Sequence, residues 1–139
     1  MISRFRLAAF ASLLVLGAGA LPAAAQDKGL ADRILSRPAA TKAADCNSPV
    51  RSDLEQCAVQ RFRAADAELN RVYRDIGGDP RNREILLSAQ RTWLAYRDAT
   101  CAWEQDLRRD GREALLNAIA CLANVTEARA AYLQQATGP

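Results

Sequence analysis

The sequence predicts an all-α fold, namely a three-helix antiparallel bundle stapled by two disulfides. Three long segments place apolar residues at every third or fourth position, which is the period of an amphipathic helix. Glycine-containing turns separate these segments, and no alternating run of Val, Ile and Thr predicts a strand. The chain also has four cysteines, an even number that suits two disulfides in an exported protein.

The first 25 residues have the pattern of a signal peptide. Arg4 and Arg6 make a basic start, residues 7–21 carry no charge, and Ala23-Ala24-Ala25 provides the Ala-x-Ala site that signal peptidase accepts. Cleavage after Ala25 would leave 114 of the 139 residues, which is enough for one domain. No cysteine follows the site for lipid attachment, so we expect a periplasmic or secreted protein without a stable membrane anchor.

Composition excludes several classes of function. The removed segment holds two of the 19 basic residues and none of the 16 acidic ones, which leaves a net charge of +1. Such a chain is not a nucleic-acid binder by bulk charge, because phosphate affinity depends on clustered Lys and Arg. Histidine is absent, which removes Ser-His and Cys-His catalytic pairs and imidazole ligands for zinc. We therefore expect no catalytic residue, no cofactor and no metal.

Residues 26–45 precede the first cysteine and show little apolar periodicity. Leu30, Ile34 and Leu35 are spaced for one helical turn, but nothing in the segment demands packing. We predict a flexible leader over residues 26–45 and a helical domain over residues 46–135.

The first predicted helix begins near Ser52 and ends at Gly77-Gly78. Ser52 and Glu55 have the spacing of a capping box, in which each side chain satisfies a free backbone N–H group. Glycine at the end favours the left-handed conformation that closes many helices. The predicted core face comprises Leu54, Cys57, Ala58, Phe62, Ala65, Leu69, Val72, Tyr73 and Ile76.

Two further helices complete the predicted bundle. Asp79 suits the N-cap and Pro80 the first position of the second helix, which ends at Gly111. The second helix has a heptad-like stripe of Leu86, Ala89, Trp93, Tyr96, Thr100, Trp103 and Leu107. The third helix runs from about residue 112 to 135, and its inward residues are Leu115, Leu116, Ile119, Leu122, Val125, Ala128 and Tyr132 or Leu133.

The four cysteines allow three pairings. Cys101 and Cys121 lie ten residues on either side of Gly111, so they would face each other across an antiparallel hairpin. A short local loop would then join Cys46 to Cys57. The rival pairing joins Cys57 to Cys101, since these two are equally distant from the turn at Asp79, and leaves Cys46 to reach Cys121. No Cys-x-x-Cys is present, so either arrangement is structural rather than redox-active.

Polar residues interrupt the apolar stripes of the first two helices and form the candidate site. Those on the first helix share one face through spacings of four and three, and those on the second cluster around its middle. One interpretation is a hydrogen-bonded network between helices, which we favour because the same faces hold core residues. The other is a ligand or partner surface. The residues are Asp66, Asn70, Tyr73, Gln90, Arg91, Trp93, Arg97 and Asp98.

These motifs resemble the LprI-like family of lysozyme inhibitors. The resemblance rests on Ala65-Asp66-x-x-Leu69-Asn70-x-x-Tyr73, Ala89-Gln90-Arg91-x-Trp93, Tyr96-Arg97-Asp98-Ala99-x-Cys101 and Cys121-Leu122, and it covers residues 46–133. It implies an exported helical domain with disulfides that binds a protein partner such as lysozyme and is not an enzyme. Animal lysozymes are basic, so an inhibitor would gain from an acidic surface. The alternative is a non-enzymatic scaffold or interaction module of the envelope with no lysozyme target.

Overall fold

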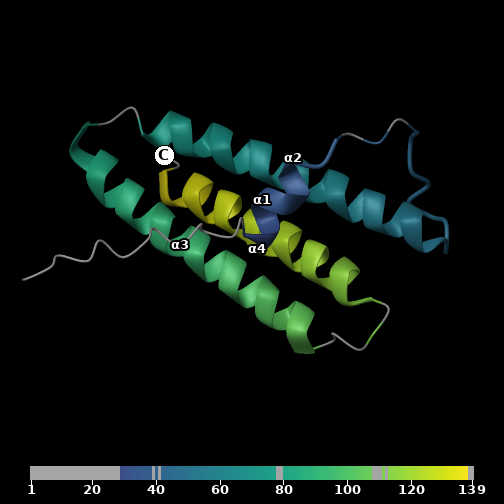
Figure 1. The fold of residues 1–139 in the computed structure, drawn as a ribbon. Helices are drawn as coiled ribbons and strands as arrows, with labels where there is room; N and C mark the ends of the chain where they lie inside the picture. The colour runs from purple at the N-terminus through teal and green to yellow at the C-terminus, as the bar shows by residue number, and fades with distance from the viewer. Residues whose placement is uncertain are drawn as a thin grey trace, which may run out of the picture.

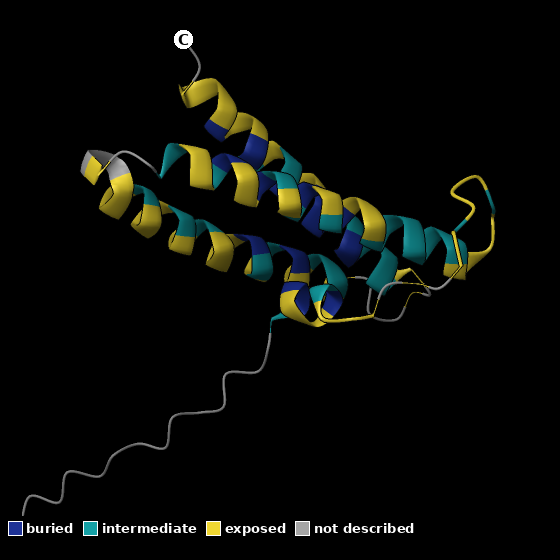
Figure 2. Ribbon diagram, turned by 90° about the horizontal axis from the view of Figure 1, so that it is seen from above, coloured by how far each residue is buried: buried dark blue, intermediate teal, exposed yellow. Residues whose placement is uncertain are grey.

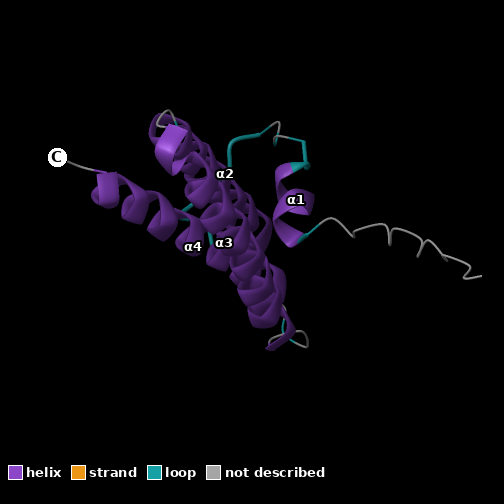
Figure 3. Ribbon diagram, turned by 90° about the vertical axis from the view of Figure 1, so that its left-hand side faces the viewer, coloured by secondary structure: helices purple, strands orange, loops and turns teal. Residues whose placement is uncertain are grey.

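The computed structural model describes residues 29–38, 40, 42–77, 80–107, 111 and 113–137. Within these ranges it contains the helices α1 (Leu30–Leu35), α2 (Arg51–Ile76), α3 (Pro80–Leu107) and α4 (Ala114–Thr137), and no strand (Figure 3). The prediction of an all-helical chain is therefore confirmed. The predicted signal peptide and Asp79 lie outside the described residues.

Helix α4 lies between α2 and α3 and packs against both, most extensively against α2 (Figure 1). In the described ranges the backbones of α2 and α3 do not approach each other closely, so side chains alone span the space between them. The expectation of three antiparallel helices thus becomes three long helices with a fourth, short one. Helix α1 lies on one side of the bundle and the C-terminal half of α4 on the other (Figure 3).

Two clusters of buried residues form the core, and they lie on the sides of the helices that face one another (Figure 2). The larger cluster surrounds Phe62 and the Cys101–Cys121 disulfide and includes Ile119 and Leu122. The smaller cluster joins α2 and α4 near the C-terminal ends of these two helices and comprises Leu69, Val72, Ala130 and Leu133. The four buried residues of α2, Phe62, Ala65, Leu69 and Val72, all belong to its predicted face.

The structure differs from the expected flexible leader at residues 30–35, which form α1. Leu30, Ala31 and Ile34 are buried in the larger core cluster, and α1 contacts all three long helices. A helix of six residues is too short to show a repeating apolar period in the sequence. Its apolar residues pack in the same cluster as Phe62 and Cys101 and shield that side of the core from water.

The predicted capping box does not form. Helix α2 begins one residue before Ser52, Val50 is its N-cap without a side-chain hydrogen bond, and Glu55 instead accepts a 2.7 Å hydrogen bond from Arg51. At the other end Gly77, the C-cap, has a right-handed φ of −66°, while Gly78, the other glycine of the expected left-handed end, lies outside the described residues. Pro80 does open α3, as predicted.

The predicted core stripe of α3 is correct only in part, since Leu86 and Trp93 pack against the smaller core cluster but the later residues of the stripe do not. Tyr96, Trp103 and Leu107 are 58%, 60% and 62% exposed, whereas Arg97 and Cys101 are buried. Adjacent helical residues point about 100° apart, so the covered face is rotated by roughly that angle from the Tyr96 direction. Helix α3 packs along α4 and makes only a small contact with α1, which accounts for the narrow strip that is buried.

The disulfides join Cys46 to Cys57 and Cys101 to Cys121, which is the pairing that the symmetry about Gly111 favoured. Cys101 and Cys121 are both buried, and their bond ties α3 to α4 inside the larger core cluster. The Cys46–Cys57 bond ties the turn before α2 to the second turn of that helix.

Candidate functional site between α2 and α3

A groove of about 320 Å³ lies between α2 and α3 and brings together five of the predicted polar residues. Spacings of three and four residues place the lining side chains of each helix on one face. The lining comprises Asp66, Leu69, Asn70 and Tyr73 from α2, and Leu87, Gln90, Arg91 and Leu94 from α3. We call these eight residues the α2–α3 groove.

The other three predicted residues, Trp93, Arg97 and Asp98, do not line the groove but belong to a network beside it. The Arg97 guanidinium is buried, and its Nε donates a 2.8 Å hydrogen bond to Oδ1 of Asp98. Its Nη1 lies 3.9 Å from Oδ1 of Asp66 across the helix pair. The guanidinium also lies 5.4 Å from the centroid of Trp93 and 5.8 Å from that of Phe62. Arg97 therefore bridges α2 and α3 from within the core.

Asp66 connects this network to the groove. Its Oδ2 accepts a 2.9 Å hydrogen bond from Nδ2 of Asn70, one turn further along α2. Burial raises the pKa of the Asp66 carboxyl above its ordinary value of 3.8, and the nearby carboxylate of Asp32 adds to the rise. The charge of Arg97 and the Asn70 hydrogen bond act in the opposite direction without cancelling it. The ionised carboxylate is thus incompletely compensated.

Helix α1 closes the space between α2 and α3 on the side of the network. A Cβ atom on Gly29, the N-cap of α1, would lie 2.9 Å from Oδ2 of Asp98, so only glycine allows this approach without a shift. Asp32 of α1 lies close enough to act on the charge of Asp66. Neither Gly29 nor Asp32 was predicted from the sequence, because both lie in a segment with little apolar periodicity, where no packing was expected.

A second arginine links α3 to α4 beneath the groove. Nε of Arg129 donates a 3.2 Å hydrogen bond to Oε1 of Gln90. Its guanidinium lies 5.9 Å from the ring centroid of Trp93 and 5.6 Å from that of Tyr132. The predicted polar residues therefore divide between a packed network and an open groove beside it.

Two groove residues have polar groups that the fold does not use. Among the residues that the structure describes, neither the Tyr73 hydroxyl nor the Arg91 guanidinium has a hydrogen-bond or ion-pair partner. Tyr73 is half-buried, while Arg91 is exposed at the rim. These groups, with Asp66, are the ones that a ligand or partner could engage.

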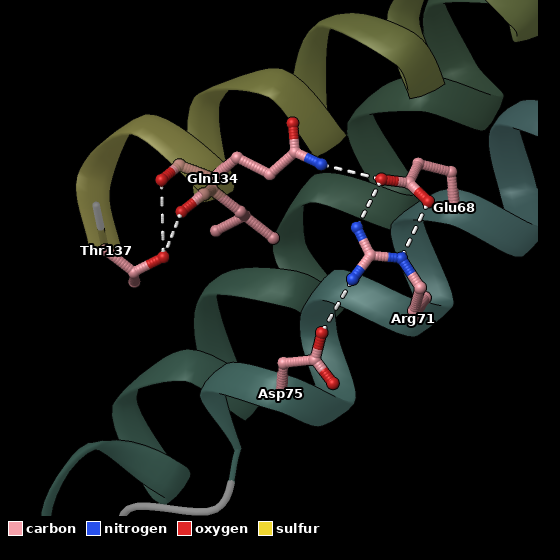
Figure 4. A network of polar contacts seen from close by, with 6 residues as sticks. Glu68, Arg71, Asp75, Gln134 and Thr137 are labelled. Carbon is pink, nitrogen blue, oxygen red and sulfur yellow. Dashed lines mark hydrogen bonds and ion pairs between the residues drawn. The ribbon is translucent and has the colours of Figure 1, made fainter. Parts of the chain in front are cut away.

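A separate polar cluster on the surface joins α2 to α4 (Figure 4). Arg71 bridges Glu68 at 2.6 Å and Asp75 at 2.8 Å, and Nε2 of Gln134 donates a 2.6 Å hydrogen bond to Glu68. The Arg71 pairing lowers the pKa of Glu68 and raises that of Arg71. All of these side chains are exposed to solvent, so each pair contributes little to stability.

The part of the chain that the structure describes contains no group of three or more residues that could hold a metal ion. Within the same part, no helix is long and apolar enough to cross a membrane.

Comparison with known proteins identifies a matching family. The family model described as lysozyme inhibitor LprI matches residues 42–133, which include α2, α3, most of α4, both disulfides and the α2–α3 groove. Helix α1 lies outside the match. An uncharacterized protein of Rhizobium meliloti (strain 1021) is 36% identical over 107 residues, which cover 66% of this chain and 77% of that protein. No solved structure matches the chain.

Proposed function

Because the chain belongs to the lysozyme inhibitor LprI family, we propose that it is exported and inhibits a lysozyme by direct protein contact. The observation that carries this proposal is the extent of the family match. It covers α2, α3, most of α4, both disulfides and the groove.

The proposed location is the periplasm or the exterior of the cell. Two disulfides and the family assignment are consistent with an extracytoplasmic protein, because disulfides persist in oxidising compartments. The basic and then apolar segment that ends at Ala25 supports export through cleavage of a signal peptide.

We propose that the partner contacts the face that contains the α2–α3 groove. The groove is concave and combines leucine walls with polar groups, which is the usual make-up of a recognition site. The proposal assigns no catalytic role to Asp66. A glycosidase needs two carboxyl groups at a defined separation, and Asp66 is the one acid among the eight groove residues.

The test is residual lysozyme activity titrated with the purified, exported protein. We expect inhibition of at least one lysozyme class, measured as slower clearing of a cell-wall suspension, with chicken-type and goose-type enzymes tried in parallel. A parallel sample without lysozyme controls for clearing by the protein itself. Full activity of both classes at micromolar excess of the protein would refute the proposal. Capture of a different envelope protein in that case would favour the scaffold alternative.

A further inference from the structure

We propose that the α2–α3 groove receives one lysine or arginine side chain from a basic protein partner, with the Asp66 carboxylate accepting the cation. The identification of that partner as a lysozyme rests on the proposed function. The recognition chemistry rests on the groove itself, so the two can fail separately.

The walls of the groove suit the aliphatic stem of a long basic side chain. Leu69 forms its buried part, while Leu87 and Leu94 on the opposite helix are 38% and 37% exposed. Lysine and arginine side chains bury their methylene groups along apolar surfaces and keep their charged heads in polar surroundings. A volume of about 320 Å³ is ample for one such side chain.

Asp66 has the acceptor capacity to bind the charged head. Its Oδ2 accepts one hydrogen bond from Asn70, and its Oδ1 faces Arg97 at 3.9 Å, beyond hydrogen-bond distance. Nε of Arg97 is already committed to Asp98 at 2.8 Å. An ionised carboxylate has about four acceptor sites, so a cation entering the groove would form the charge-assisted hydrogen bonds that Asp66 lacks.

The position of the charges favours a cation at Asp66 itself. Three carboxylates, those of Asp66, Asp98 and Asp32, lie around the groove and the adjoining network. Three guanidiniums oppose them: Arg97 is buried beside Asp66 and Asp98, Arg129 faces Gln90 and the rings of Trp93 and Tyr132, and Arg91 is exposed at the rim, where water screens its charge. The charges of the site therefore balance overall. The preference for a cation rests on Asp66, the one acid among the eight groove residues, whose Oδ1 has no hydrogen-bond partner in the described part of the chain.

The first experiment tests the chemistry without lysozyme. We would follow backbone amide NMR signals of the exported protein during titration with Nα-acetyl-lysine N-methylamide, and with the same compound acetylated on Nε. The expected result is a shift of the Asn70, Leu87 and Leu94 signals with the charged compound only. An Asp66→Asn variant should lose the response, and Asp75→Asn, whose carboxylate pairs with Arg71 outside the groove, should keep it. Equal responses to both compounds, or none, would overturn the proposal.

The second experiment measures inhibition. We expect Asp66→Asn to weaken inhibition about tenfold or more, because a charge-assisted hydrogen bond would be lost. A Leu87→Lys variant places a cation of the chain's own at the groove wall and should weaken inhibition similarly, while Leu87→Met should not. Leu87 is partly exposed, so its variants test the groove even if Asp66→Asn fails to fold. Unchanged inhibition by Leu87→Lys would refute the inference and leave the proposed function standing. Binding of the lysine compound without lysozyme inhibition would support the inference about the groove and refute the proposed function.

Discussion

Nη1 of Arg97 on α3 lies 3.9 Å from Oδ1 of Asp66 on α2, and this contact spans two helices whose backbones do not approach each other closely in the described chain. The guanidinium is buried and also faces the rings of Phe62 and Trp93. The structural network and the open groove therefore meet at Asp66, so substitutions on either side of it should have different effects.

We predict that Arg97→Met lowers the free energy of unfolding by about 2 kcal/mol or more. Removing one partner of a fully buried pair costs roughly 3–5 kcal/mol, and the cost here is smaller because Asp66 and Asp98 keep some contact with water. Urea unfolding followed by circular dichroism measures the change. Arg97→Lys should recover only part of it, because an ammonium lacks the planar shape that faces two rings. Wild-type stability of Arg97→Met would show that the bridge is dispensable.

We predict that the effect of Asp66→Asn on stability, relative to wild type, is more favourable at pH 7 than at pH 3. The pKa of Asp66 is raised in the folded state, so the folded chain holds this proton more tightly than the unfolded chain does. Ionisation of Asp66 therefore costs stability as the pH rises through 3.8 and then through the raised folded value. The groups that face it, Arg97, Asn70 and Asp32, remain in the variant.

Melting temperatures of wild type and Asp66→Asn at pH 3 and pH 7 test whether ionisation of Asp66 lowers stability. The difference between variant and wild type should be more positive at pH 7 than at pH 3. A more negative difference at pH 7 would mean that the carboxylate is stabilised by its surroundings, contrary to the account given for the groove.

We predict that Ile34→Ala lowers the free energy of unfolding by about 2–5 kcal/mol, the range for a fully buried isoleucine truncated to alanine. Ile34 packs in the cluster that contains Phe62 and Cys101. The matched control is Ser36→Ala, an exposed position just after α1, which should change stability by less than about 0.5 kcal/mol. Chemical denaturation of both variants decides the point. Equal stabilities would mean that α1 does not hold its place in solution.

We predict that replacing Cys101 and Cys121 together by alanine lowers the free energy of unfolding by about 3 kcal/mol. The bond closes a separation of 20 residues, for which the chain-entropy account gives about that value. Replacing Cys46 and Cys57, which are 11 residues apart, should cost slightly less. Denaturant titrations measure both losses, and peptide mapping without reduction identifies the bonds. A fragment that joined Cys57 to Cys101 would contradict the pairing.

The sequence was sufficient to predict α2 and its buried face, because the apolar residues from Phe62 to Val72 keep helical spacing and α4 covers that whole line. It was correct only in part for α3. The spacing from Leu86 to Leu107 shows which residues share a face, but the direction in which α4 lies decides whether that face is covered. For this reason Tyr96 and Trp103 are exposed and Arg97 is buried.

The candidate site was predictable in part for the same reason. Asp66, Asn70 and Tyr73 share a face of α2 by spacing alone, and the structure places them opposite Gln90 and Arg91. The contribution of α1 could not be predicted, because Gly29 and Asp32 act through contacts with residues far away in the chain. A helix of six residues is too short to indicate where it will pack.

We propose that a lysozyme binds at the α2–α3 groove. A photo-cross-linking side chain placed at Leu94, on the groove wall, and in a second variant at Trp103, which does not line the groove, tests it most directly. Each variant would be irradiated with a lysozyme that the wild-type protein inhibits, and the adducts counted by mass spectrometry. We expect adducts from position 94 and few or none from position 103. Adducts from position 103 alone, or from neither position, would contradict the proposal.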